Sequence, residues 1–138
     1  MKKKDCNFCK IVQGNLESWK IFENENVYAF LDINPVNKYH TLVIPKNHYK
    51  NIYEIPQKDY LSVMKSVKEI TERYKKELNI DNVQIISNSG IEAQQDVFHF
   101  HVHIVPRESN DGQDIKWDTK PKLREEFDEM IKNFKNQL

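Results

Sequence analysis

Short apolar runs along the chain predict a β-sheet. Each run is rich in β-branched and aromatic residues, and turn residues such as Asn34-Pro35 and Asn88-Ser89-Gly90 follow two of them. The predicted strands are 27–33, 40–45, 82–87 and 97–105. We expect the first two to pair as antiparallel neighbours, since only a short segment with a turn signal separates them.

Apolar residues at helical spacing predict two main helices. Between Tyr60 and Leu78 they recur every three or four positions with Lys, Glu and Arg between them, and Pro56 suits a first helical turn. A second stripe predicts a C-terminal helix at about 121–137, and it comprises Leu123, Phe127, Met130, Ile131 and Phe134. A short helical turn is expected over 8–12. Together with the strands, the helices indicate an α+β fold with a mostly antiparallel sheet.

Composition narrows the possible functions. The 138 residues suit one domain with a buried core, and we expect that domain to span 1–138. Lys plus Arg and Asp plus Glu each number 21, so the formal charge is zero, which argues against non-specific nucleic-acid binding but leaves a small phosphorylated ligand possible. No apolar run approaches the roughly 20 residues of a membrane span. No signal-type hydrophobic stretch follows the basic N-terminus, so we expect a cytoplasmic protein.

Three histidines alternate along the last predicted strand. Because alternate residues of a strand share a face, His99, His101 and His103 are expected to point the same way. The opposite, buried face would hold Phe98, Phe100, Val102 and Ile104. A merely solvated face is more often made of Thr, Lys or Glu, because imidazole titrates near neutral pH. Three exposed histidines with no function are one interpretation of the pattern. Two functional interpretations of the three histidines remain. One is a metal site, although three ligands on one straight strand suit a tetrahedral metal poorly. The other is nucleophilic attack on phosphorus by a neutral imidazole.

Cys6 and Cys9 form a Cys-x-x-Cys pair near the N-terminus. In a reducing compartment such a pair is more often a metal or redox site than a disulfide. The redox interpretation is the weaker one, because no thioredoxin-like pattern follows the pair. Two buried thiols without a ligand are the third possibility.

The histidine segment resembles the signature of the histidine triad (HIT) family. Residues 99–105, His-Phe-His-Val-His-Ile-Val, follow its pattern of three histidines with apolar residues between and after them. Further segments match the family in the same order along the chain: 6–11, 30–35, 40–46, 88–90 and 95–99. The resemblance covers about residues 5–107. The segment with the Cys-x-x-Cys pair is similar to the N-terminus of the bacterial-type branch of the family. It implies a five-stranded, mostly antiparallel sheet with two main helices.

The resemblance implies a hydrolase similar to the purine nucleoside phosphoramidases. Such enzymes attack the α-phosphate of a nucleotide conjugate and form a covalent nucleotidyl-histidine intermediate. Carried onto this chain, His101 is the nucleophile, and its other ring nitrogen is held by a backbone carbonyl near His99. His103 then hydrogen-bonds the phosphate, and His40 joins the proton network. No cofactor is required for this chemistry.

The resemblance also implies the residues that bind the nucleotide. Asp32 would hold the ribose hydroxyls, Gln95 the phosphoryl or leaving-group side, and Asn88 the phosphate loop. The base pocket would be lined by Phe8, Ile11, Phe30 and Ile33. Taken by themselves, Asp32 and Asn88 are also typical of turns, and the four apolar residues of a core. Asp96 stands where some branches have Ser or Thr, and we expect this carboxylate to point away from the phosphate.

A structural zinc ion and a second subunit are further implications of the resemblance. Bacterial-type members carry a Cys2His2 zinc site, which here corresponds to Cys6, Cys9, His48 and His99. A homodimer is also implied, and Trp117 then either reaches the partner's active site or covers local surface. The expected ligand is an adenosine or guanosine monophosphate conjugate. The alternatives are a dinucleoside polyphosphate hydrolase, a nucleotide-binding interaction module with little catalysis, and a metallohydrolase with its metal on the three histidines.

Overall fold

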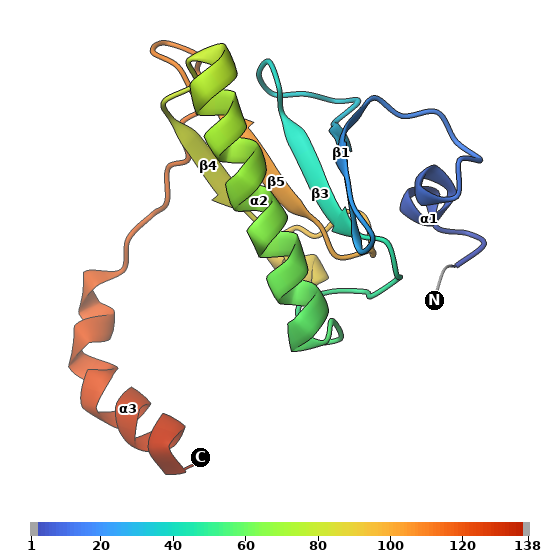
Figure 1. Ribbon diagram of the computed structural model, residues 1–138. Helices are drawn as coiled ribbons and strands as arrows, with labels where there is room; N and C mark the ends of the chain where they lie inside the picture. Colours follow the sequence, from blue (N-terminus) through green and yellow to red (C-terminus); the bar gives the residue numbers. More distant parts are fainter. Residues whose placement is uncertain (1–2, 137–138) are drawn as a thin grey trace.

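Five antiparallel strands form one sheet in the computed structural model, which describes residues 3–136 (Figure 1). Their order across the sheet is β1-β2-β3-β5-β4. The strands are β1 (Lys20–Glu23), β2 (Val27–Leu31), β3 (Thr41–Pro45), β4 (Val83–Ile86) and β5 (Val102–Pro106). Strands β2 and β3 pair as predicted, with Ala29 opposite Val43. The predicted α+β fold with a five-stranded, mostly antiparallel sheet is confirmed.

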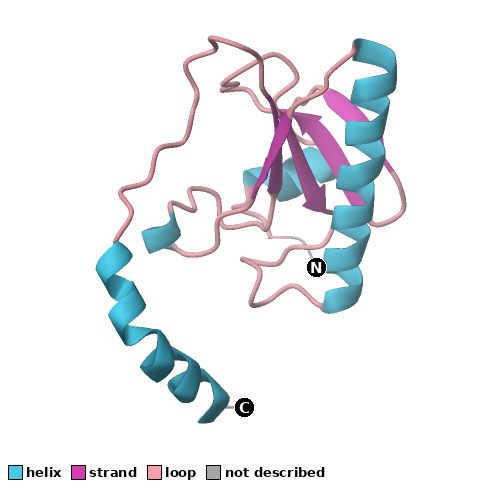
Figure 2. Ribbon diagram, turned by 90° about the vertical axis from the view of Figure 1, so that its left-hand side faces the viewer, coloured by secondary structure: helices cyan, strands magenta, loops and turns pink. Residues whose placement is uncertain are grey.

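Helices lie against both faces of this sheet (Figures 1 and 2). The long helix α2 (Gln57–Leu78) crosses one face, and the short helix α1 (Asn7–Val12) packs on the other. Pro56 precedes α2 in an extended conformation, and Asn79 ends the helix with a left-handed φ of 58°. Within residues 3–136, no helix combines the length and apolar character that crossing a bilayer requires.

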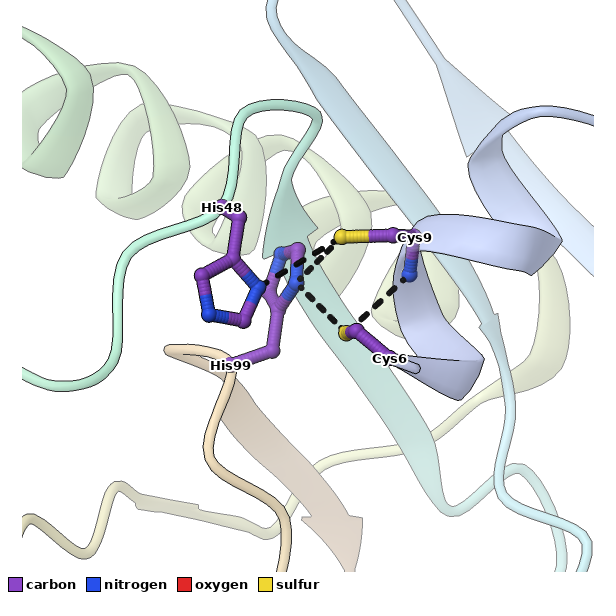
Figure 3. A group of neighbouring side chains, drawn as sticks. All are labelled: Cys6, Cys9, His48 and His99. Carbon is purple, nitrogen blue, oxygen red and sulfur yellow. Dashed lines mark hydrogen bonds between the residues drawn. The ribbon is translucent and has the colours of Figure 1, made fainter. Parts of the chain in front are cut away.

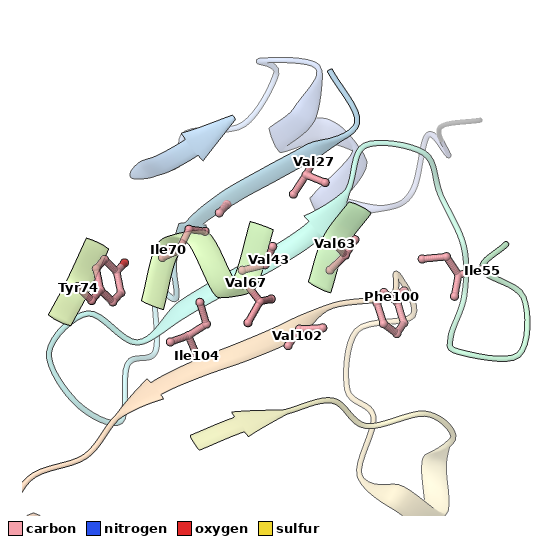
Figure 4. Close-up of a cluster of buried hydrophobic side chains, with 11 residues drawn as sticks. Val27, Val43, Ile55, Val63, Val67, Ile70, Tyr74, Phe100, Val102 and Ile104 are labelled. Atoms are coloured by element: carbon pink, nitrogen blue, oxygen red, sulfur yellow. The ribbon is translucent and has the colours of Figure 1, made fainter. Parts of the chain in front are cut away.

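Two apolar clusters fill the spaces between the sheet and its helices. Under α2, buried side chains of the helix, sheet and adjoining loops form the cluster of Figure 4: Val27, Ala29, Val43, Ile55, Val63, Val67, Ile70, Tyr74, Phe100, Val102 and Ile104. Beside α1, the second cluster comprises Cys6, Phe8, Cys9, Ile11, Tyr28, Phe30, Leu42 and Ile44. Because β2 and β3 bury both faces, their sequences do not alternate between apolar and polar residues, and Thr41 at the start of β3 is buried as well.

The histidine segment is a strand over only half of the predicted range. Strand β5 begins at Val102, and residues 97–101 approach it as an irregular segment. The prediction that Phe98 faces the core is therefore wrong, since this side chain is 38% exposed, whereas Phe100 is buried. The backbone N–H of Phe100 donates to the carbonyl of Tyr49 instead of to a neighbouring strand. The alternation of apolar and polar residues over 97–101 therefore does not mean that these residues form a strand.

The C-terminal segment differs from the expected single helix. A 3₁₀ helix, η2 (Pro121–Glu126), leads into α3 (Phe127–Asn136), and position 137 lies outside the described residues. Both views show α3 standing away from the sheet (Figures 1 and 2). Its predicted apolar stripe exists but is exposed, and it comprises Leu123, Phe127, Met130, Ile131 and Phe134. Packing within the described chain therefore does not account for this stripe.

Candidate functional site

A cavity of about 840 Å³ opens between the N-terminal segment, the end of β2 and the histidine segment. His101 and His103 form part of its wall, together with Asp32 from the turn after β2. The predicted base-pocket residues also line it: Phe8, Ile11, Phe30 and Ile33. Phe8, Ile11 and Phe30 belong to the α1 cluster too, so they serve both core and wall. The structure thus brings the predicted nucleophile and most predicted nucleotide-binding residues around one space.

The ring of His101 is oriented by a hydrogen bond to the nearby backbone. Its Nδ1–H donates to the backbone carbonyl of His99, 2.7 Å away, as the resemblance implied. A neutral imidazole carries one ring proton, so Nε2 then has a free lone pair. The rings of Phe8 and His101 pack nearly perpendicular to each other, with 5.3 Å between their centroids. His101 is therefore held with a nucleophilic nitrogen available to the cavity.

A second hydrogen-bond chain assigns the protons of His40 and His103. The backbone N–H of Val36 donates to His40 Nδ1 at 3.1 Å, so the ring proton of neutral His40 lies on Nε2. This Nε2–H donates to His103 Nδ1 at 2.9 Å. The proton of neutral His103 is consequently on Nε2, which makes that atom a hydrogen-bond donor at the cavity wall.

Burial keeps both of these rings neutral. It lowers the pKa of His103 to about 4, aided by the neighbouring His101 and His40, while Asp32 and Asp96 act in the opposite direction. Burial also lowers the pKa of His40, against the attraction of Asp32. At neutral pH the two rings therefore act as hydrogen-bonding groups and not as cations.

Asp32, His40 and His103 lie close enough together to raise the question of a metal ion, since their candidate ligand atoms are all within 4.8 Å of one another. The proton assignment argues against one. His40 Nε2 carries the proton that it donates to His103, and its Nδ1 accepts from the backbone, so neither nitrogen has a lone pair to spare. Asp32 is held by the N–H of Asn34, which donates to its Oδ1 at 2.8 Å, and its Oδ2 lies 3.5 Å from His40 Nε2.

Asp96 faces the nucleophile. Its Oδ1 lies 3.8 Å from His101 Nε2, and the same oxygen accepts the backbone N–H of Val97 at 2.9 Å. The expectation that this carboxylate points away is therefore wrong. The turn at Val97 fixes the carboxylate locally, and a sequence pattern does not encode that direction.

Gln95 and Asn88 are not among the residues that line the cavity within the described chain. The Gln95 side chain is buried, and its Oε1 accepts the N–H of Gly90 at 2.8 Å. Its Nε2 donates to the carbonyls of Lys50 and Val97 at 2.7 and 3.1 Å. Gln95 therefore joins the loop that contains Lys50 to the loop that contains Gly90 in this conformation.

Cys6, Cys9, His48 and His99 converge on one point (Figure 3). Cys6 and His48 are also among the residues that line the cavity. The Sγ of Cys9 lies 3.4 Å from His48 Nδ1 and 3.5 Å from His99 Nδ1, and the Sγ of Cys6 lies 3.4 Å from His99 Nδ1. A tetrahedral zinc ion with bonds of about 2.3 Å to sulfur and 2.0–2.1 Å to nitrogen would place such atoms about 3.5 Å apart. The four positions predicted for zinc thus have the spacing that the ion requires.

His99 presents the correct atom to this cluster. Its Nε2–H donates to the carbonyl of Pro45 at 2.9 Å, which leaves the Nδ1 lone pair directed at the cysteines. Burial lowers the pKa of His99 to about 4 and also lowers that of His48, so both rings are neutral and able to ligate. Both cysteines are buried and free of a disulfide.

The sequence model of the HIT domain matches residues 13–110 of the chain. This chain belongs to the HIT family. An uncharacterised HIT-like protein of Methanocaldococcus jannaschii is 42% identical over 130 residues, which is 94% of this chain and 98% of that protein. An adenosine 5′-monophosphoramidase of Saccharomyces cerevisiae is 34% identical over 134 residues, 96% of this chain and 80% of the yeast enzyme.

Solved HIT structures share this fold. A HIT family protein from Bacillus anthracis superposes with a TM-score of 0.88 at 36% identity, and the match covers 98% of each chain. A Zn-bound histidine triad family protein from Mycobacterium smegmatis gives a TM-score of 0.76 at 35% identity, covering 84% of each chain.

One wall of the HIT cavity was not foreseen from the sequence. Residues of the segment between α1 and β1 line it, namely Leu16, Glu17, Ser18 and Trp19. Trp19 is 54% exposed there, with its indole available to a ligand. The sequence holds no clear signal for this wall, because Trp19 and the nearby Leu16, Ile21 and Phe22 are equally compatible with burial in a core.

Proposed function

We propose that this HIT protein hydrolyses nucleoside 5′-phosphoramidates at the α-phosphate, with His101 as a covalent nucleophile. The orientation of His101 carries the proposal: its Nδ1–H is fixed on the His99 carbonyl and its Nε2 lone pair is free. The yeast relative named for adenosine 5′-monophosphoramidase activity, 34% identical to this chain, supports the same reaction class.

In the first step, His101 Nε2 forms a bond to phosphorus as the P–N bond of the substrate breaks. The amine nitrogen keeps the bonding electrons and takes a proton from water in the open cavity. The product is a nucleotidyl imidazolium, because Nδ1 keeps its proton on the His99 carbonyl. His103 Nε2–H donates to a phosphoryl oxygen and stabilises the charge that develops there.

In the second step, a water molecule attacks phosphorus and the N–P bond breaks. The electron pair returns to Nε2, and the water releases one proton to solvent. The overall reaction converts a phosphoramidate and water into a nucleoside monophosphate and an amine. His40 acts by holding the tautomer of His103, through the 2.9 Å hydrogen bond between their rings.

The nucleoside is held by the part of the cavity wall beside the histidines. Asp32 accepts hydrogen bonds from the ribose hydroxyls, which a carboxylate with two acceptor oxygens suits. The base lies among Phe8, Ile11, Phe30 and Ile33, of which Ile33 is 72% exposed and free to close over a ligand. Gln95 and Asn88 hold the loop beside the phosphate in this proposal. Gln95 does so through its hydrogen bonds to the backbone of Gly90 and Lys50.

The cysteine and histidine cluster holds a structural zinc ion in this proposal. Cys6, Cys9, His48 and His99 supply a closed set of two sulfur and two nitrogen ligands, which leaves no open position for chemistry. The ion contributes stability by joining α1 to the histidine segment. The Zn-bound relative from Mycobacterium smegmatis supports this assignment.

A homodimer and a cytoplasmic location stay predictions. In favour of self-association, β4 is an edge strand of the sheet, and its Val83 and Ile85 side chains are exposed. Trp117 is 83% exposed, so it does not cover its own surface as one alternative required. Sedimentation of the wild type and of Ile85→Lys tests the dimer, and a wild type that sediments as a monomer at all concentrations would exclude it.

A turnover assay tests the proposed reaction. Wild type and His101→Gly are compared on adenosine phosphoramidate, guanosine phosphoramidate and a diadenosine polyphosphate. The wild type is expected to release AMP and ammonia from adenosine phosphoramidate. In His101→Gly, kcat is expected to fall at least about 1000-fold, because the covalent intermediate can no longer form. AMP binding by the variant shows that its cavity is intact. Preference for the polyphosphate, or binding without turnover of any substrate, would favour one of the alternative functions.

A further inference from the structure

The carboxylate of Asp96 has no part in the chemistry proposed above, yet it lies 3.8 Å from the attacking nitrogen of His101. On the basis of the proposed function, we propose that Asp96 selects the leaving group by charge. The preferred substrates are then nucleoside phosphoramidates of amines that carry an additional positive charge.

The position of Asp96 is built into the turn that contains it. Its Oδ1 accepts the backbone N–H of Val97 at 2.9 Å, so the carboxylate is held locally and does not depend on a distant partner. The side chain is 80% exposed and lines the cavity. A ligand therefore meets the charge directly, without first displacing a protein cation.

The two carboxylates nearest the histidines have separate neighbours. Asp32 lies against His40, with 3.5 Å between Oδ2 and Nε2, and Asp96 lies against His101. Asp32 is taken by the ribose in the proposed function. Of these two carboxylates, Asp96 is thus the one left for the part of the substrate that departs from phosphorus.

The charges of the cavity wall favour the same class of ligand. Among the lining residues in the described chain, the acidic side chains outnumber the single lysine, Lys3. The acidic ones are Asp5, Glu17, Asp32 and Asp96. Lys50, whose Nζ lies 5.7 Å from the centroid of the Phe98 ring, lines a neighbouring cavity instead. An excess of negative charge disfavours a polyphosphate leaving group, which carries several negative charges of its own, and favours a cationic one.

The selection acts while the P–N bond breaks. As the amine leaves with the bonding pair and gains a proton, a second ammonium group on the same molecule is attracted by the Asp96 carboxylate. At about 4 Å, one charge pair in water changes a rate by roughly fivefold. Between a cationic and an anionic leaving group, we expect a change on the order of tenfold in kcat/KM, since Asp96 is exposed and partly screened.

Three adenosine 5′-phosphoramidates of similar size test this inference. Their leaving groups are 1,3-diaminopropane, butylamine and β-alanine, which place a positive charge, no charge and a negative charge at the far end. Wild type is expected to prefer the first over the last by about tenfold in kcat/KM. In Asp96→Asn this ratio is expected to fall at least fivefold. The ratio is the readout because it cancels any general loss of rate in the variant.

Glu17→Gln is the matched control, since it removes one negative charge from the same cavity wall. Among the carboxylates of the described chain, only Asp32 and Asp96 form an ion pair with a histidine, so the effect of Glu17→Gln on the ratio should be smaller than that of Asp96→Asn. An equal effect would assign the selection to the whole cavity and overturn the role of Asp96. Salt supplies a test without a variant, because raising ionic strength from about 0.02 to 0.5 M should shrink the wild-type preference.

The outcomes separate the two proposals. If the wild type cleaves none of the three compounds, the proposed function itself fails. If it cleaves all three with equal kcat/KM, or if Asp96→Asn keeps the wild-type ratio, charge selection by Asp96 is wrong while phosphoramidate hydrolysis stands.

Discussion

His101 and His99 are joined by a 2.7 Å hydrogen bond from the imidazole Nδ1–H of the former to the backbone carbonyl of the latter. The side chain of His99 in turn directs Nδ1 at Cys6 and Cys9. The candidate nucleophile is therefore oriented by the backbone of a residue whose side chain belongs to the candidate metal cluster. Stability of the cluster and orientation of the nucleophile depend on the same short segment.

Loss of one cysteine should abolish zinc binding and weaken the fold. Cys9→Ser is expected to reduce bound zinc from near one ion per chain to near zero, and to lower the free energy of unfolding by about 3 kcal/mol when free zinc is some hundredfold above its dissociation constant. Zinc is measured after dialysis and stability by urea unfolding. A chelator should lower the Tm of the wild type and leave that of the variant unchanged. Wild-type protein without zinc would contradict the assignment.

The pH dependence of stability should contain a contribution from His103. Burial lowers its pKa from the ordinary 6.5 to about 4, so between these values the unfolded chain binds more protons than the folded one. Stability should therefore decrease as the pH falls from about 6.5 to 4. His103→Asn, whose amide oxygen can still accept the His40 Nε2–H, should reduce the decrease between pH 7 and pH 5 by on the order of 1 kcal/mol, since the ring is partly exposed. Equal decreases in urea unfolding would contradict this expectation.

The central elements could be predicted because a single pattern determines each of them. Strands β2 and β3 are apolar on both faces, and α2 has one apolar stripe between a proline start and a left-handed Asn79 end. The edge strand β1 escaped prediction because it has only four residues and charged ends, Lys20 and Glu23. The other edge strand, β4, has the same length, but its Val-Gln-Ile-Ile run lacks charged ends and matches the strand predicted at 82–87.

Parts of the site depended on loop conformation, which no periodicity records. The segment 97–101 alternates like a strand, but Phe100 packs in the core, Phe98 is exposed, and only His99 of the two histidines belongs to the cysteine cluster. The direction of Asp96 follows from its bond to the Val97 N–H. Trp19 lines the cavity because the chain between α1 and β1 folds back beside it. Residue identities were available from the sequence, whereas these directions were not.

Trp19 should contribute to binding and not to the chemical step. Its exposed indole lines the cavity and has no part in the proposed chemistry, so Trp19→Ala is expected to raise KM for adenosine phosphoramidate about tenfold and to change kcat little. Steady-state kinetics check this. Trp117→Ala is the matched comparison, because Trp117 does not line the cavity of its own chain within the described residues. A rise in KM in that variant as well would indicate that Trp117 reaches the site of a partner subunit.

His40 should act through the tautomer of His103. In His40→Leu the ring of His103 loses the proton donor to its Nδ1, so its proton is no longer confined to Nε2 and its hydrogen bond to the phosphate is lost in part of the molecules. We expect kcat to fall about 10- to 100-fold, the rate equivalent of one lost buried hydrogen bond, with a smaller change in KM. His40→Gln can donate an amide N–H toward the same nitrogen and should recover part of the loss. If His40→Leu and His40→Gln are equally impaired, the hydrogen bond to His103 does not set the rate. If His40→Leu keeps the wild-type kcat, the proton assignment of the two rings has no catalytic role.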